Sequence, residues 1–130
     1  MSSEAEPILA GVRVVEMCTG IPGPVAGLLL AEAGADVIKV ERPRGDPMRV
    51  SPGFRTWNRS KRGVVLDLDR EPDRADFFRL LGTADVLLHG FRPSQAALRG
   101  LADAQHRLEV PGDVDAERRR RSLRRVVPAA

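Results

Sequence analysis

The fold of this 130-residue chain is decided by residues 23–42, GPVAGLLLAEAGADVIKVER. Glycine and proline open this stretch, apolar residues follow at helical spacing, and Gly34 comes after them. This pattern predicts a helix over about residues 24–33 that ends before Gly34. The β-branched run after the glycine predicts a strand over about 36–40, and VRVVEM at 12–17 predicts another upstream. Together they form a β-α-β unit, which implies a parallel pair with a right-handed crossover.

The same alternation continues downstream of a long segment, residues 43–58, which we expect to be irregular because it holds three prolines and two glycines. The pattern predicts the following elements: a strand at about 64–68, a helix at 71–82, a strand at 86–88, and a short helix from Ser94 to about Leu98 or Leu101. Strands that alternate with helices predict an α/β fold, here a Rossmann-like parallel sheet with flanking helices, in one domain over residues 1–103.

Residues 104–130 lose this periodicity, and they contain the run ERRRRSLRR at 117–125. We expect an Arg-rich, disordered tail without a regular element, Val126-Val127 included. The tail holds seven arginines and four acidic residues, whereas residues 1–103 hold 14 basic and 14 acidic residues. The net charge of +3 therefore belongs to the tail, and nucleic-acid binding, which we do not expect, would depend on the tail alone.

Composition excludes several classes of function. No apolar run approaches the roughly 20 residues that span a bilayer, and the acidic N-terminus lacks the features of a signal peptide, so we expect a cytoplasmic protein without a membrane partner. The single cysteine, Cys18, excludes an intrachain disulfide and fits a small buried side chain better than a nucleophile. His89 and His106 are isolated, and no residue spacing suggests a metal site.

Candidate ligand-binding residues follow the predicted strands, because ligands of open parallel sheets bind beyond the carboxyl ends of the strands. The loop 18–23 leads into a helix N-terminus that could receive an anion, although it is not a GxGxxG motif. Glu41-Arg42 fits a surface ion pair and phosphate recognition by the arginine equally well. Residues 58–62 concentrate three cations, and a solvated loop is favoured there over a ligand site.

Two further loops offer weaker signals. Asp67 and Asp69 lie along or just past the third predicted strand, where a capping role is favoured over a catalytic one. Phe91 stands beside Arg92 after the fourth strand, where it fits the core most simply but could also stack on a purine. The residues alone therefore indicate a phosphate- or nucleotide-type ligand and no identifiable nucleophile.

Three motifs in this order resemble the N-terminal part of the class III CoA-transferases, the family of formyl-CoA transferase, carnitine CoA-transferase and α-methylacyl-CoA racemase. They are GADVIKVERP at 34–43, NRSKRGVVLDLD at 58–69 and ADVLLHGFRP at 84–93, and the resemblance covers residues 8–101. It implies a CoA-binding domain in an interlocked dimer. In such enzymes a carboxylate takes the acyl group as a mixed anhydride, releases CoA and passes the acyl group on.

The resemblance also implies which residues contact CoA, and no metal is among the implied ligands. The implied contacts are Ile21, Pro22, Arg42, Leu66, Asp67, Leu68, Asp69, Gly90, Phe91, Arg92 and Arg99. The chain has Ile21-Pro22 where the family commonly has a pair such as Gln-Ala, and Gly90 where the family has Asn, which implies a different acyl group or a weakened site.

The family's catalytic aspartate lies beyond the region of resemblance, so no catalytic residue can be named in this chain. We interpret the chain as a truncated CoA-transferase domain that binds acyl-CoA or CoA, is inactive alone, and ends in a tail typical of a frameshifted high-GC gene. Only Lys39 and Lys61 are lysines, against 19 arginines, which fits that origin. The alternatives are a CoA-binding module that works as a homodimer or with a complementary chain, and nucleic-acid binding through the tail.

Overall fold

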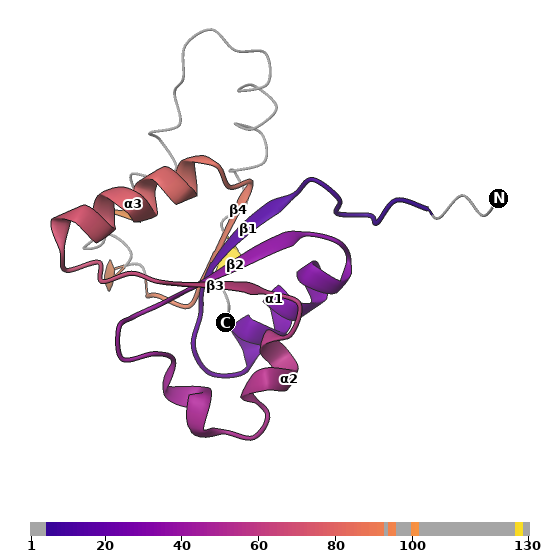
Figure 1. Cartoon of the computed structure of the whole chain (residues 1–130), viewed down its shortest axis with the longest axis horizontal. Coiled ribbons are helices and arrows are strands. Elements are labelled where there is room, and N and C mark those ends of the chain that lie inside the picture. Colours follow the sequence, from indigo (N-terminus) through magenta and orange to yellow (C-terminus); the bar gives the residue numbers. More distant parts are fainter. Residues whose placement is uncertain (1–4, 93, 96–99, 102–126, 129–130) are drawn as a thin grey trace, which may run out of the picture.

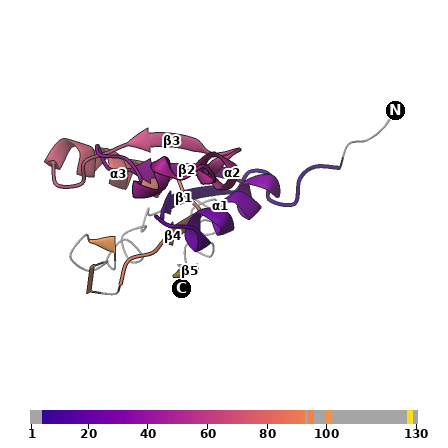
Figure 2. The ribbon, with the colours of Figure 1, turned by 90° about the horizontal axis from the view of Figure 1, so that it is seen from below.

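The computed structural model of the chain describes residues 5–92, 94, 95, 100, 101, 127 and 128. Within them the strands form one sheet in which every pairing is parallel, in the order β3-β2-β1-β4-β5. Figure 2 shows this order, from β3 at the top to β5 at the bottom. The strands are β1 Arg13–Met17, β2 Asp36–Glu41, β3 Arg62–Val65, β4 Val86–His89 and β5 Val127–Pro128. The predicted α/β fold with a parallel, Rossmann-like sheet is confirmed.

Helices cover both faces of the sheet, with α3 on one side and α1 and α2 on the other (Figure 1). Successive residues of a strand point to opposite faces, and the two core clusters follow this alternation. Val15 and Leu87 pack in the same cluster as Phe77 and Leu81 of α3, whereas Val14 packs in the cluster that includes Leu30 of α1. The helical elements are α1 Pro22–Glu32, the 3₁₀ helix η1 Pro47–Val50, α2 Phe54–Asn58 and α3 Glu71–Gly82.

Helix α3 begins and ends where the sequence predicts, whereas the third strand does not. The strand expected at 64–68 is β3, Arg62–Val65, which pairs in register with β2 from Ile38↔Arg62 to Glu41↔Val65. Because β2 ends at Glu41, the ladder ends there too, and the N–H of Leu66 makes a last bond to the Glu41 carbonyl at 3.0 Å. Leu66 and Leu68 then turn onto the α3 cluster instead of continuing the strand.

We expected the segment 43–58 to be irregular because of its prolines and glycines. This is wrong for the part of the segment that forms η1 and α2. The Asp46 side chain caps η1 by accepting the N–H of Met48 at 2.8 Å, and Asn58 Nδ2 donates to the Phe54 carbonyl at 3.0 Å within α2. These local bonds satisfy backbone groups at the ends of short elements, which helical periodicity cannot reveal.

The end of the chain departs from expectation at two residues. Val127 and Pro128 form β5, a parallel partner of β4 with Leu88↔Val127 and His89↔Pro128 in register, so the prediction of no regular element there is wrong for these two residues. Gln95 is helical, as predicted, and Ser94, predicted as the N-cap, is itself helical, while most of that predicted helix and of the tail lies outside the described residues.

Candidate functional site at the carboxyl edge of the sheet

The strand order creates a switch point between β1 and β4. From β1 the chain proceeds outward on one side to β2 and β3, and it then crosses over to place β4 on the other side of β1. The next strand after β1 lies on one side of this pair and β5 lies on the other, and open α/β sheets bind ligands beyond the carboxyl ends of the strands at such a point. The loop after Met17 and the loop after His89 flank this point.

The loop after β1 leads directly into α1. Gly20 adopts φ +82°, a left-handed conformation that favours glycine, and Ile21 then precedes the helix with its side chain 47% exposed. Pro22 occupies the first turn, and no side chain caps the helix N-terminus. Within this first turn Gly23 alone offers an N–H to an anion, because Pro22 and Pro24 have none and the N–H of Val25 donates to the Ile21 carbonyl at 2.9 Å.

After β2 the structure separates the two residues that the sequence places together. Glu41 is buried and accepts two hydrogen bonds from Arg49, Nε at 2.7 Å and a terminal nitrogen at 2.6 Å, as well as one from the Asp46 N–H at 2.8 Å. These bonds, with that from Arg49 the strongest, lower the pKa of Glu41 below its ordinary 4.5. Arg42 is exposed and does not pair with Glu41, so its guanidinium is available to a ligand.

The residues after β3 are held by local bonds. Asp67 Oδ1 accepts the N–H of Asp69 at 3.1 Å, and the N–H of Asp67 donates to Asp73 Oδ2 at 2.8 Å in the first turn of α3. The Asp67 side chain thus closes a local turn, but it does not cap α3, whose N-cap Arg70 makes no side-chain cap bond, and Asp69 is exposed and contributes its backbone. Leu66 and Leu68 are partly buried against the α3 cluster.

After β4, Phe91 stacks on His89 with ring centroids 5.7 Å apart and planes 24° apart. The N–H of Phe91 donates to His89 Nδ1 at 3.2 Å, and burial lowers the pKa of His89 below 6.5, so the imidazole is neutral at pH 7. Phe91 also packs on the α3 cluster, in line with its predicted core role. Gly90 and Arg92 on either side of it are exposed.

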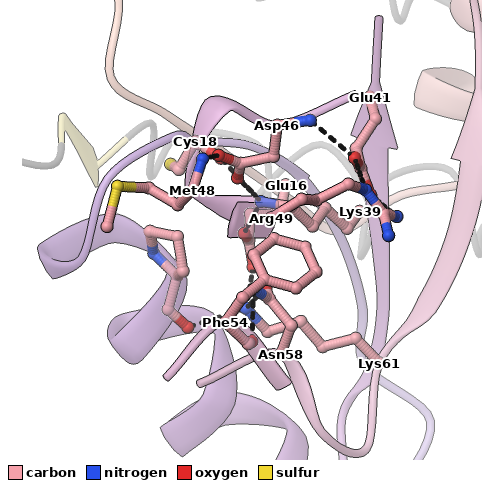
Figure 3. Close-up of polar contacts among 11 residues, drawn as sticks. Glu16, Cys18, Lys39, Glu41, Asp46, Met48, Arg49, Phe54, Asn58 and Lys61 are labelled. Atoms are coloured by element: carbon pink, nitrogen blue, oxygen red, sulfur yellow. Dashed lines mark hydrogen bonds and ion pairs between the residues drawn. The ribbon is translucent and has the colours of Figure 1, made fainter. Parts of the chain in front are cut away.

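Four buried charged side chains meet one another (Figure 3), and they contact the loop after β1, helix α1 and the segment after β2. They are Glu16, Lys39, Asp46 and Lys61, which we call the buried charge cluster, and none has more than 4% of its side chain exposed. Lys39 Nζ lies 3.2 Å from Glu16 Oε1 and 3.0 Å from Asp46 Oδ2, and Lys61 Nζ lies 2.7 Å from Glu16 Oε2. The two positive and two negative charges balance, as buried charges require.

The ammonium groups of the cluster also bind uncharged oxygens. Lys39 Nζ donates to the Cys18 carbonyl at 2.7 Å, and Lys61 Nζ donates to the Pro24 carbonyl at 2.7 Å and to Asn58 Oδ1 at 3.0 Å. Contacts to Glu16 Oε2 and Asp46 Oδ2 have the distances of ion pairs without the angles of directed hydrogen bonds. Burial lowers the pKa of Lys61 below 10.5, and the bond to Glu16 opposes this effect.

Cys18 lies next to the cluster but is not built as a nucleophile. Its thiol is buried, and burial together with the negative charge of Glu16 raises its pKa to about 12. At neutral pH the sulfur is therefore a protonated thiol, whereas nucleophilic cysteines act as thiolates. This agrees with the expectation of a small buried side chain.

Comparison with known proteins supplies the assignment that the geometry leaves open. The sequence profile of CoA-transferase family III matches residues 9–112. The chain belongs to CoA-transferase family III. The family match extends past the predicted boundary of resemblance at residue 101.

Individual relatives agree with this family III assignment. The chain is 39% identical over 121 residues to the probable fatty acyl-CoA transferase Rv3272 of Mycobacterium tuberculosis, covering 85% of this chain and 30% of that protein. It is 38% identical over 112 residues to succinate–glutarate CoA-transferase of Agrobacterium fabrum, covering 74% and 28%. The chain thus spans about three tenths of the length of these relatives.

Solved structures of the family share the fold. A crystal structure of M. tuberculosis Rv3272 matches with a TM-score of 0.72 and 36% identity over 91% of this chain and 31% of that one. A CAIB/BAIF family protein from Brucella suis matches with a TM-score of 0.70 and 28% identity over 95% and 33%. The family assignment does not favour the nucleic-acid alternative.

For this family III chain the structure brings most predicted site residues to one edge of the sheet. Ile21 and Pro22 follow β1, Arg42 follows β2, residues 66–69 follow β3 and residues 90–92 follow β4. Arg99 lies outside the described residues, as does His106. The role of the predicted site residues in CoA binding stays a prediction.

Sequence reasoning missed the buried charge cluster. The loop at 58–62 was expected to be solvated, and this is wrong for Lys61, whose side chain is 2% exposed, although Arg59 and Arg62 are exposed. Glu16 and Lys39 read as ordinary strand residues. One signal was present: the only two lysines among 21 basic residues are the two buried cations.

The described part of the chain offers neither a cluster of metal ligands nor a membrane-spanning helix. Its His, Cys, Asp and Glu side chains form no group of three that could hold a metal ion. None of its helices combines the length and the apolar character needed to cross a membrane.

Proposed function

We propose that this chain is the CoA-binding part of a family III CoA-transferase and that CoA binds at the carboxyl edge of the sheet, over the switch point between β1 and β4. The observation that carries the proposal is the convergence at this edge of an uncapped helix N-terminus and an exposed arginine that is not engaged by the adjacent carboxylate, Glu41. Both features suit the phosphates of CoA.

Each loop has a part that its chemistry suits. The N–H of Gly23 in the first turn of α1, beside Ile21 and Pro22, and the guanidinium of Arg42 would bind phosphates. Phe91 would offer an aromatic surface to the adenine, with Arg92 beside it, and residues 66–69 would line the same edge through backbone and partly buried leucines. Arg99 would supply a further cation.

The reaction of the whole protein would be transfer of CoA between acyl groups. An aspartate outside this chain would attack the carbonyl of the acyl thioester, which forms the mixed anhydride and releases the CoA thiolate. The carboxylate of a second acid would then displace the first acid as its carboxylate, and the CoA thiolate would attack the carbonyl of the second acid to form the new thioester and free the aspartate. This part of the protein would act in a homodimer or with a complementary chain in the cytoplasm. One relative is described as the alpha subunit of succinyl-CoA–L-malate CoA-transferase, which supports an assembly of unlike chains.

Calorimetric titration of the full chain with CoA tests the proposal. We expect saturable binding that Arg42→Ala weakens by about tenfold or more, the usual cost of a hydrogen bond between charged groups. Arg44→Ala is the matched control, because Arg44 is an exposed arginine two residues away for which no role is proposed. Its affinity should stay close to that of the wild type.

Titration with dephospho-CoA separates the phosphates. If Arg42 binds the 3′-phosphate, the wild type will bind dephospho-CoA more weakly than CoA. The wild type and Arg42→Ala will then bind dephospho-CoA with equal affinity. A folded wild-type chain that does not bind CoA, or equal losses in Arg42→Ala and Arg44→Ala, would contradict the proposal.

A further inference from the structure

The buried charge cluster forms hydrogen bonds with both ends of the loop between β1 and α1. Lys39 Nζ donates to the carbonyl of Cys18 where the loop begins, and Lys61 Nζ donates to the carbonyl of Pro24 in the first turn of α1, both at 2.7 Å. The residues between them include Ile21 and Pro22. Hydrogen bonds from a charged donor are about twice as strong as neutral ones, so these two bonds restrain the loop more than ordinary turns would.

The same ammonium groups connect that loop to a segment distant in sequence. Asp46 Oδ2 pairs with Lys39, while Asp46 Oδ1 caps η1. Asn58 Oδ1, at the end of α2, accepts from Lys61. The cluster therefore joins the loop after β1 to the segment after β2, the segment in which Arg42 lies (Figure 3).

The geometry requires lysine in particular. Each ammonium has three N–H groups, and each meets three oxygens, two through hydrogen bonds and one through an ion pair. A guanidinium is planar, larger and has five donors, so it cannot fit between the same three oxygens. The chain has 21 lysines and arginines in all, and Lys39 and Lys61 are its two lysines.

The helix leaves room for this arrangement. Gly27 of α1 faces the carboxylate of Glu16, and an added Cβ would collide with Glu16 Oε2 and lie 3.1 Å from Lys61 Nζ. The close approach of α1 to the cluster sets the position of the helix whose first turn is the proposed phosphate site.

We propose that Lys39 and Lys61 are positioning residues, which hold the loop after β1 and the first turn of α1 in the shape that CoA binding requires. This inference rests on the proposed function as far as CoA is concerned. Neither side chain would touch CoA, since both are buried beneath the loop.

Amide hydrogen exchange of the full chain, followed by NMR without ligand, tests the restraint directly. The N–H of Val25 donates to the Ile21 carbonyl at 2.9 Å and reports on the first turn of α1. The N–H of Asp85 donates to the Arg13 carbonyl at 2.8 Å at the opposite end of the sheet and serves as the reference. In Lys39→Arg and Lys61→Arg, Val25 should exchange about tenfold faster or more, with a much smaller change at Asp85.

The matched control is the reverse exchange, Arg62→Lys, at an exposed ion pair, which should change neither amide. Asn58→Ala is a milder variant in case the lysine variants do not fold, because it removes one acceptor from Lys61 while keeping all charges. It should speed exchange at Val25 by about two- to tenfold, the usual effect of one hydrogen bond.

Calorimetry of the same variants connects the restraint to the ligand. Faster exchange at Val25 alone, together with weaker CoA binding, supports the proposal. Equal acceleration at Val25 and Asp85, or no change at Val25, overturns it, because the lysines would then affect only global stability or nothing. If the wild type does not bind CoA but Val25 responds selectively, the proposed function fails, while the role of the lysines in holding the loop stands.

Discussion

The two ends of the sheet each hold a cluster of charged side chains, but water reaches them to very different extents. At the amino end, Asp36, the first residue of β2, pairs with Arg13 and with Arg62, the first residues of the neighbouring strands, and 35–63% of each side chain is exposed. Towards the carboxyl ends of β1 and β2 lies the buried charge cluster, which Lys61 enters from the start of β3, and its side chains are at most 4% exposed. The chemistry is the same, carboxylate with cation, and only the surroundings differ.

This difference in exposure decides what each cluster does. Exposed pairs gain little, because water solvates the separated charges almost as well and salt screens them. Buried charges are costly to desolvate, so each must keep its partners in good geometry. The amino-end cluster therefore tolerates change, whereas the buried charge cluster ties together every segment that contributes to it.

The largest expected effect comes from Glu16→Gln, which keeps the side-chain shape but leaves two buried ammonium groups against one carboxylate. Loss of one partner from a buried pair costs about 3–5 kcal/mol of unfolding free energy. Urea unfolding measures this loss, and salt should hardly change it. The matched control is Asp36→Asn at the amino end. Equal losses in the two variants would contradict the contrast between the clusters.

A smaller effect is expected from Gly27→Ala in α1. The change would normally favour a helix, but the new Cβ meets the Glu16 carboxylate, which cannot move aside without breaking its ion pairs. We expect a loss of about 1–3 kcal/mol, as for overpacking. Gly82→Ala in α3 is the control, because its Cβ would meet nothing within 4 Å. If both variants unfolded at a higher temperature than the wild type, the Glu16 carboxylate would be able to move aside at little cost, which would contradict this expectation.

The smallest effect is expected at Asp36. Hydrogen bonds from Arg62 and then from Arg13 lower the pKa of its carboxyl below 3.8 in the folded state. The unfolded chain therefore binds the proton first, and the stability that Asp36 contributes above pH 3.8 is lost as the pH falls through the folded-state pKa. Asp36→Asn should cost about 0–1 kcal/mol at neutral pH and low salt.

Urea midpoints at several pH values and salt concentrations check this expectation. The gap between the wild type and Asp36→Asn should close in acid and in concentrated salt. A gap that persisted in both would mean that the amino-end cluster behaves like the buried one.

Much of the fold was predictable because it depends on local signals. Proline and acidic residues at the start of α3 and Gly82 at its end gave its bounds correctly, and the β-branched run at 36–40 marked β2. The start of β3 was not predictable, because pairing with Ile38 decides it, and the hydrophobic run at 64–68 pointed elsewhere. Of the two short helices between β2 and β3, η1 depends on the Asp46 side-chain cap, whereas α2 has no side-chain cap at its start and is held by the bond from Asn58 to the Phe54 carbonyl.

For the site, the sequence by itself determined the residues that follow each strand, since the order of strands and helices places those loops at one edge of a parallel sheet. Only the tertiary structure decided that β1 lies between β2 and β4, that Glu41 turns inward to Arg49 while Arg42 stays exposed, and that Lys39 and Lys61 are buried against Glu16. The physical reason is that burial and pairing of charge depend on neighbours distant in the chain, and no local pattern of residues encodes them.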